Sequence, residues 1–180
     1  LPQAGRAPRR VTNFRDDRTL RSAFWRESFN VRRCLVPASS FAEPAEVTPA
    51  TWHWFAMKPR LIPAHQVTAQ ERPLFAFAGI WRRWQGPIRK AGPEVCLDVY
   101  SFMTTMPNSL VATINHERMP VLLRTEQERT LWLTGSPEAA IRLAAPAPPE
   151  VIQIVQEGFE KQDFVGADHP QAEPSQPRLI

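Results

Sequence analysis

Two separate stretches of the sequence carry side chains that can move protons. His116 and Arg118 stand in the polar row 115–118 between two apolar segments, and Glu43 follows an apolar segment that ends near Pro37. A histidine titrates near neutral pH, a desolvated carboxyl can act as an acid or a base, and a guanidinium binds anions. This set suits proton transfer beside an anionic substrate. For each residue an ordinary solvent-facing or structural role is the alternative, and the local sequence leaves both open.

A third stretch, Thr12-Asn13-Phe14-Arg15, offers a possible anion-binding pair. If the backbone is extended there, Asn13 and Arg15 point to the same side, because alternate side chains of a strand share a face. The two side chains could then hold a phosphate or a sugar. Turn capping is the alternative use of the asparagine.

The elements that must position these residues are mostly strands. The segment from Ser39 to Glu43 is predicted as a turn that follows a strand, and Gly79 is expected to mark a bulge or a close approach of two chains. Short helices are predicted at 19–29, after the capping-box pattern Thr125–Glu128, and at 139–144 after Ser136. Strands are predicted at 33–37, 51–57, 73–84, 94–104, 119–123 and 151–155.

This order of elements predicts an α+β fold with a bent, barrel-like and mostly antiparallel β-sheet core and short peripheral helices. We expect a single domain over residues 1–165 and a loosely ordered C-terminal tail over 166–180. The 19 prolines agree with many loops and short elements. No apolar run approaches the roughly 18 residues of a membrane span, so no membrane partner is expected.

Charge and cysteine content narrow the classes of partner and cofactor. Nine of the arginines lie between residues 1 and 33, which favours a nucleic-acid partner, although a solvated arginine-rich surface is an equal alternative. Cys34 and Cys96 lie in apolar runs, where reduced, packed thiols are expected. The four histidines show no metal-ligand spacing, so we expect no metal and no cofactor.

The motifs together are more specific than any one of them. The segments TNFR (12–15), RRCLVPASSFAEP (32–44), PLFAFAGIWRRW (73–84), SFMTTMPN (101–108) and HERMPVLL (116–123) resemble the SOS response-associated peptidase family in order and spacing. The resemblance extends over roughly residues 1–155. Pro44 and Glu117 stand where the family most often has an aromatic residue and an aspartate.

The resemblance implies a DNA-damage role on single-stranded DNA. Family members remove their initiator methionine, and the exposed N-terminal cysteine condenses with the aldehyde of an abasic site to a thiazolidine DNA–protein crosslink. By motif position, Glu43 and His116 would be catalytic: Glu43 as the acid/base and His116 as an aid to sugar ring opening. Asn13, Arg15, Arg118 and, more weakly, Thr105 would contact the DNA.

The family's N-terminal segment with the nucleophilic cysteine is missing from the printed sequence, so we expect no thiazolidine crosslink from this chain as it stands. Two other hypotheses therefore stay open: a non-covalent single-stranded-DNA-binding remnant, and a small-substrate hydrolase that uses Glu43 and His116. We expect a monomer in the cytoplasm, associated with the nucleoid. Whether the chain is itself an enzyme is left open, with an autopeptidase and abasic-site crosslinking (hydrolase- or lyase-type) activity as the expectation from the family.

Overall fold

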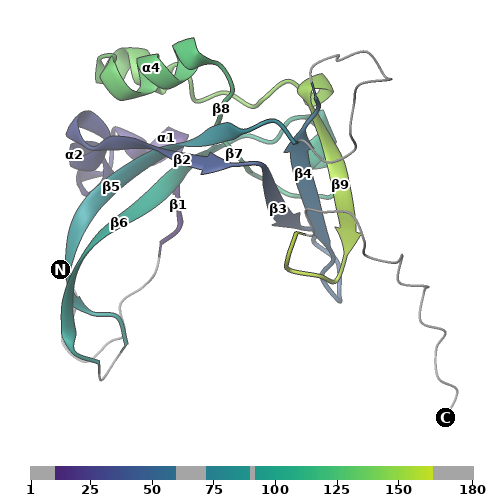
Figure 1. Cartoon of the computed structure of the whole chain (residues 1–180), viewed down its shortest axis with the longest axis horizontal. Coiled ribbons are helices and arrows are strands. Elements are labelled where there is room, and N and C mark those ends of the chain that lie inside the picture. The colour runs from purple at the N-terminus through teal and green to yellow at the C-terminus, as the bar shows by residue number, and fades with distance from the viewer. Residues whose placement is uncertain (1–10, 60–71, 90–91, 164–180) are drawn as a thin grey trace, which may run out of the picture.

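Two β-sheets frame the part of the chain that the structure, a computed structural model, describes: residues 11–59, 72–89 and 92–163. Figure 1 shows the sheets as the two sides of an arch. The first sheet contains β1 (Asn13–Arg15), β2 (Arg33–Ala38), β5 (Phe75–Pro87), β6 (Glu94–Thr105), β7 (Met119–Pro120) and β8 (Leu122–Leu123). The second sheet contains β3 (Ser40–Pro44), β4 (Trp52–Met57) and β9 (Ile152–Gly158).

Strand pairing places the segments that carry the candidate residues side by side. The first sheet has the order β1-β6-β5-β2, with β7 paired to β6 and β8 paired to β5. Only β1 and β6 are parallel among the described pairs, and Arg15 is the partner of Thr104 there. The second sheet has the antiparallel order β3-β4-β9. The prediction of an α+β fold with a bent, mostly antiparallel core is confirmed.

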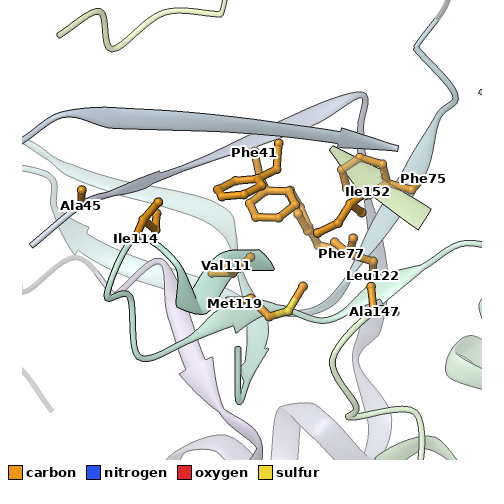
Figure 2. Packing of buried hydrophobic residues seen from close by; sticks show 11 residues of the cluster. Phe41, Ala45, Phe75, Phe77, Val111, Ile114, Met119, Leu122, Ala147 and Ile152 are labelled. Atoms are coloured by element: carbon orange, nitrogen blue, oxygen red, sulfur yellow. The ribbon is translucent and has the colours of Figure 1, made fainter. Parts of the chain in front are cut away.

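Alternate residues of β5 face two different hydrophobic clusters, as the period of a strand requires. Phe75 and Phe77 pack with Phe41 and Phe55 of the second sheet in the first cluster, part of which Figure 2 shows. Ala76, Ala78 and Ile80 of β5 face the other side of the sheet and belong to a second cluster. That cluster consists of Phe14, Phe29, Ala76, Ala78, Ile80, Met103, Val121, Leu123, Trp132 and Ala140.

Three of the helices cover the second cluster: α2, α4 and α5 supply Phe29, Trp132 and Ala140 to it. The capping box is confirmed, because Thr125 Oγ1 accepts from the backbone N–H of Glu128 (3.1 Å) and the Glu128 carboxylate accepts from that of Thr125 (2.9 Å). No helix in the described ranges is long and apolar enough to cross a membrane. The helices are α1 (Asp16–Thr19), α2 (Ala23–Val31), α3 (Ser109–Ala112), α4 (Glu126–Thr134), α5 (Pro137–Ile141) and the 3₁₀ turn η2 (Pro149–Val151).

Three sequence predictions were wrong in detail. The predicted turn with Glu43 is strand β3, because its residues pair with β4 in register; the turn signals Ser39 and Ser40 mark only the junction after β2. The single strand predicted at 119–123 is split into β7 and β8, which pair with different strands. Cys96 is exposed rather than packed, because the outer part of β6 has little covering it. The predicted tail at 166–180 lies outside the described residues.

Gly79 marks a close approach of two strands, as predicted, and this makes a test of the fold. A Cβ at Gly79 would lie 2.8 Å from Cys34 Sγ and 3.0 Å from the Cys34 carbonyl oxygen on β2. We expect Gly79→Ala to lower the free energy of unfolding by roughly 1–3 kcal/mol, since one contact is rigid backbone. Urea unfolding would measure this. Gly92→Ala is the matched control, because its new Cβ meets nothing closer than 3.5 Å; equal stability of both variants would contradict the prediction.

Candidate active site

The carboxyl group of Glu43 and the imidazole of His116 are in direct contact. Glu43 Oε2 lies 2.8 Å from His116 Nε2, and only 16% and 24% of the two side chains are exposed. Glu43 comes from β3 in the second sheet, whereas His116 comes from the segment before β7 in the first. The structure thus brings together the two residues that the sequence analysis predicts as a catalytic pair. Their catalytic role stays a prediction.

The position of Glu43 on β3 explains its unusual ionisation. Phe41 and Glu43 share one face of the strand, and Ala45 follows directly after its end. Phe41 and Ala45 both belong to the first hydrophobic cluster. Figure 2 shows Ala45 beside Ile114 at one end of that cluster. Burial raises the pKa of Glu43 to about 8. At neutral pH the carboxyl is therefore mostly protonated, and it can donate a hydrogen bond to the imidazole.

His116 is presented by a sharp change of chain direction. Ile114 is 8% exposed and packs in the first cluster. Asn115 has φ 58°, in the left-handed region, which asparagine adopts more readily than most residues. Because the chain reverses at Asn115, Ile114 stays in the core while His116 faces Glu43. The asparagine of the polar row therefore has a structural role beside the histidine.

Arg118 and Thr105 converge on a residue that the sequence analysis missed, Asp16. Its Oδ1 lies 2.5 Å from Arg118 Nη2, and its Oδ2 accepts a hydrogen bond of 2.7 Å from Thr105 Oγ1. Arg118 also donates to the backbone carbonyl of Thr104. Asp16 and Arg118 are mostly buried, with 19% and 15% of their side chains exposed. The only signal for Asp16 in the sequence is its place directly after the TNFR motif.

Asn13 and Arg15 lie on an exposed face of β1. The burial pattern alternates, with Phe14 buried between two exposed neighbours, so the prediction that both side chains share a side is confirmed. Arg15 makes two hydrogen bonds to Asp17, of 3.0 and 2.9 Å. Contact of these residues with a phosphate stays a prediction.

A second histidine, His53, stands beside the pair and was not predicted. The register of the second sheet puts His53 opposite Glu43 on one side and opposite Glu157 on the other. Directly paired residues of antiparallel strands share a face, so His53 contributes to the burial of Glu43. Its Nε2 lies 3.9 Å from Glu157 Oε1, and its buried Nδ1 has no hydrogen-bond partner among the described residues. A lone histidine between tryptophans gave no signal for this place.

The arginine-rich N-terminal third serves the fold as well as the surface. Arg32 pairs with Glu27 at 2.8 Å, and Arg33 donates to backbone carbonyls of Phe29 in α2 and Trp132 in α4. These two arginines therefore hold helix ends. The arginines exposed to solvent are Arg15, Arg18, Arg21 and Arg26, while Arg6, Arg9 and Arg10 lie outside the described residues.

The remaining nucleophile and metal candidates are spread out. Cys34 is half-buried in β2, where burial raises the pKa of its thiol, and Cys96 lies in β6. Across residues 11–59, 72–89 and 92–163, no group of three or more histidine, cysteine or acidic side chains is arranged to hold a metal ion.

The fold and the site define an α+β protein in which a carboxyl from the second sheet and an imidazole from the segment before β7 form a largely buried pair. The family model for the SOS response associated peptidase (SRAP) matches residues 2–157. The chain belongs to this family.

Curated relatives and a solved structure agree with the family. The abasic site processing protein YoqW of Bacillus subtilis is 31% identical over 124 residues, which are 69% of this chain and 48% of YoqW. YobE of the same organism, also an abasic site processing protein, is 27% identical over 69% of this chain and 49% of its own length. The chain thus spans about half the length of the curated relatives it matches. A crystal structure of a Bacteroides thetaiotaomicron protein has a TM-score of 0.62 at 26% identity and covers 80% of this chain and 58% of that one.

Proposed function

We propose that the protein processes abasic sites in single-stranded DNA through acid–base catalysis by Glu43 and His116. The observation that carries this proposal is the 2.8 Å contact between a carboxyl with a pKa of about 8 and an imidazole. A pair of this kind can supply a proton and take it back near neutral pH. The names of the relatives YoqW and YobE, both abasic site processing proteins, support DNA with abasic sites as the substrate.

The chemistry of an abasic site needs such a pair twice. The deoxyribose must first open to its aldehyde: the ring oxygen gains a proton, which protonated Glu43 would supply, and the anomeric hydroxyl loses one, which His116 would help to remove. An amine then adds to the aldehyde, and the proton that the attacking amine loses would return to Glu43. The resulting hydroxyl leaves as water when Glu43 protonates it, which gives an imine. Addition of a neighbouring thiol to the imine carbon closes a thiazolidine.

The amine and the thiol would come from an N-terminal cysteine, as in the family. Neither cysteine of the printed sequence fits this role, because Cys34 and Cys96 lie inside strands β2 and β6. Release of an initiator methionine to expose such a cysteine is a peptide hydrolysis, and we assign its acid–base step to Glu43 as well.

DNA would be held by the groups around Asp16 and β1. Asn13 and Arg15 share an exposed face of β1, and Arg15 is the strand partner of Thr104, next to Thr105. Within the described residues the hydrogen bonds of Arg118 use Nε and Nη2, which leaves Nη1 for a phosphate. We propose that Asn13 orients the opened sugar and that the two arginines contact phosphates, while Thr105, which is buried, supports this region through its hydrogen bond to Asp16.

A side-by-side crosslinking assay tests the proposal. The 180-residue chain and the same chain extended by a family N-terminal segment that begins Met-Cys would each be incubated with a single-stranded oligonucleotide containing one abasic site. On a denaturing gel, we expect a shifted band for the extended chain alone. On a native gel, we expect both chains to bind the oligonucleotide, less tightly as salt rises.

Other outcomes would replace the proposal. Salt-dependent binding by both chains without any covalent product would identify a non-covalent single-stranded-DNA-binding protein. A lack of DNA binding by either chain would leave Glu43 and His116 to a small-substrate hydrolase. An oligonucleotide that is identical except for an intact base at the abasic position is the substrate control.

A further inference from the structure

Asp16 joins three segments of the first sheet at one end of β6. It directly follows β1, while Thr105 ends β6 and Arg118 directly precedes β7. Since β1 and β7 both pair with β6, Asp16 and Arg118 approach the end of β6 from opposite sides. Their ion pair (2.5 Å) and the hydrogen bond from Thr105 (2.7 Å) close over this strand end.

The ion pair between Asp16 and Arg118 can fix the position of His116, because Arg118 ends the short segment that carries this histidine. At its other end this segment begins after Asn115, whose backbone N–H donates to the carbonyl of Ala112 at the end of α3 (3.0 Å). His116 therefore lies between two fixed points: the turn at Asn115 and the Arg118–Asp16 ion pair. Glu117, the remaining residue of the segment, is exposed and adds no buried contact.

The charges around Arg118 point to Asp16 as its counter-ion. The side chain of Arg118 is 15% exposed, and besides Asp16 its hydrogen bonds among the described residues go to the neutral hydroxyl and carbonyl of Thr104. Asp17, the next acidic residue, is turned to Arg15. Loss of the Asp16 charge would leave a largely buried cation with only the charge of Asp17 nearby, which is paired with Arg15. The segment with His116 would then have to move for the cation to reach water.

We propose that Asp16 is a positioning residue that, through Arg118, holds His116 against Glu43. Its part in the reaction depends on the proposed abasic-site function, whereas its effect on the geometry of the pair does not. Among the described residues the Asp16 carboxylate bonds to Arg118, Thr105 and the backbone of Asp17 and to neither member of the pair, so it acts through the segment 116–118.

The test measures the pair directly in the free protein. The pKa of the Glu43 carboxyl would be followed by NMR of ¹³C-labelled glutamate in the unmodified chain and in Asp16→Asn. If His116 is released, water reaches Glu43, and we expect its pKa to fall from about 8 by more than about one unit. In the extended chain, we expect the rate of crosslinking at saturating DNA to fall on the order of 10- to 100-fold, because misplacement by about 1 Å has that effect.

Two further variants keep the test decisive. Asp98→Asn is the matched control, because Asp98 is paired with an arginine on the same sheet, in the exposed part of β6; we expect no change in the Glu43 pKa. Thr105→Val removes the hydroxyl that donates to Asp16 at 2.7 Å and also lies 3.4 Å from the Ala144 carbonyl, and we expect a smaller fall in the same direction. An unchanged Glu43 pKa in a folded Asp16→Asn protein would overturn the proposal. A lowered pKa without any abasic-site reaction in the unmodified extended chain would keep the positioning role and reject the proposed function.

Discussion

Replacement of Glu43 by glutamine is expected to slow the chemistry strongly and, at the same time, to stabilise the fold above about pH 4.5. Glutamine keeps the shape of the side chain but cannot donate and recover a proton. General acid–base groups contribute on the order of 10²- to 10⁴-fold in rate, so crosslinking and methionine release in the extended chain should fall by that amount. DNA binding should change little, because Glu43 faces His116 rather than the exposed arginines.

The gain in stability follows from the raised pKa of Glu43. The ordinary value of 4.5 applies to the unfolded chain, and burial raises it to about 8 in the folded protein. Between these two values the unfolded state loses the proton while the folded state keeps it. The stability associated with Glu43 is therefore fully present below about pH 4.5 and is lost as the pH rises to about 8. Glutamine has no such loss.

The free energy of unfolding of Glu43→Gln should thus exceed that of the unmodified protein by an amount that grows with pH. At about 1.36 kcal/mol per pKa unit, the variant should be more stable by roughly 3 kcal/mol at pH 7, with no further gain above about pH 8. Urea unfolding at pH 4.5, 6, 7 and 8.5 would measure it. A pH-independent difference would show that Glu43 is not protonated in the folded protein.

Glu128→Gln is a control of opposite sign. Despite partial burial, hydrogen bonds from the backbone N–H groups of Thr125 and Arg124 lower the pKa of Glu128, which closes the capping box of α4. Its stabilising effect is present above the unfolded value of about 4.5 and is lost as the pH falls through the lowered value. Glu128→Gln should therefore be less stable than the unmodified protein at neutral pH and nearly as stable in acid. Glu43→Gln, in contrast, should be more stable than the unmodified protein at neutral pH.

The sequence predicted Glu43 and His116 as a pair, and the structure places them in contact, but the sequence did not predict the strand that holds Glu43. Glu43 and His116 were chosen from residue types and motif resemblance, and neither choice depends on knowing which strands pair. The placement of Glu43 in a turn failed because serines are strong local turn signals, whereas the pairing of β3 with β4 is decided by packing of Phe41 on Phe55. The packing of β3 on β4 therefore outweighs the local turn preference of the serines.

Side chains whose neighbours are set by the pairing of distant strands could not be found from the sequence. Asp16 and Arg118 are 102 residues apart, and they meet because both β1 and β7 pair with β6. His53 is equally hidden, since its position beside Glu43 follows from a strand register and a shift of one residue would turn it to the other face. Asn115, in contrast, was visible as part of a polar row, but its backbone role needed the structure.

Replacement of Arg118 by alanine is expected to affect both stability and DNA binding, and the two effects can be separated. The variant leaves Asp16 largely buried without its guanidinium, which should lower the free energy of unfolding by roughly 2–4 kcal/mol. In Asp16→Asn/Arg118→Ala the uncompensated charge is gone, so the double variant should be more stable than Arg118→Ala alone. Urea unfolding of the four proteins of this cycle measures the coupling.

DNA binding of the same variants then decides what else Arg118 does. If Nη1 of Arg118 also contacts a phosphate, Arg118→Ala should weaken the binding of single-stranded DNA about tenfold. It should also reduce the slope of log K against log salt by about 0.7, which is the amount for one phosphate on a single strand. The double variant should show the same loss of slope although it regains part of the stability. Arg83→Ala, on the exposed part of β5, is the matched arginine control. An unchanged slope in both Arg118 variants would mean that this guanidinium serves Asp16 alone, and the phosphate contacts would then rest with Arg15 and its exposed neighbours.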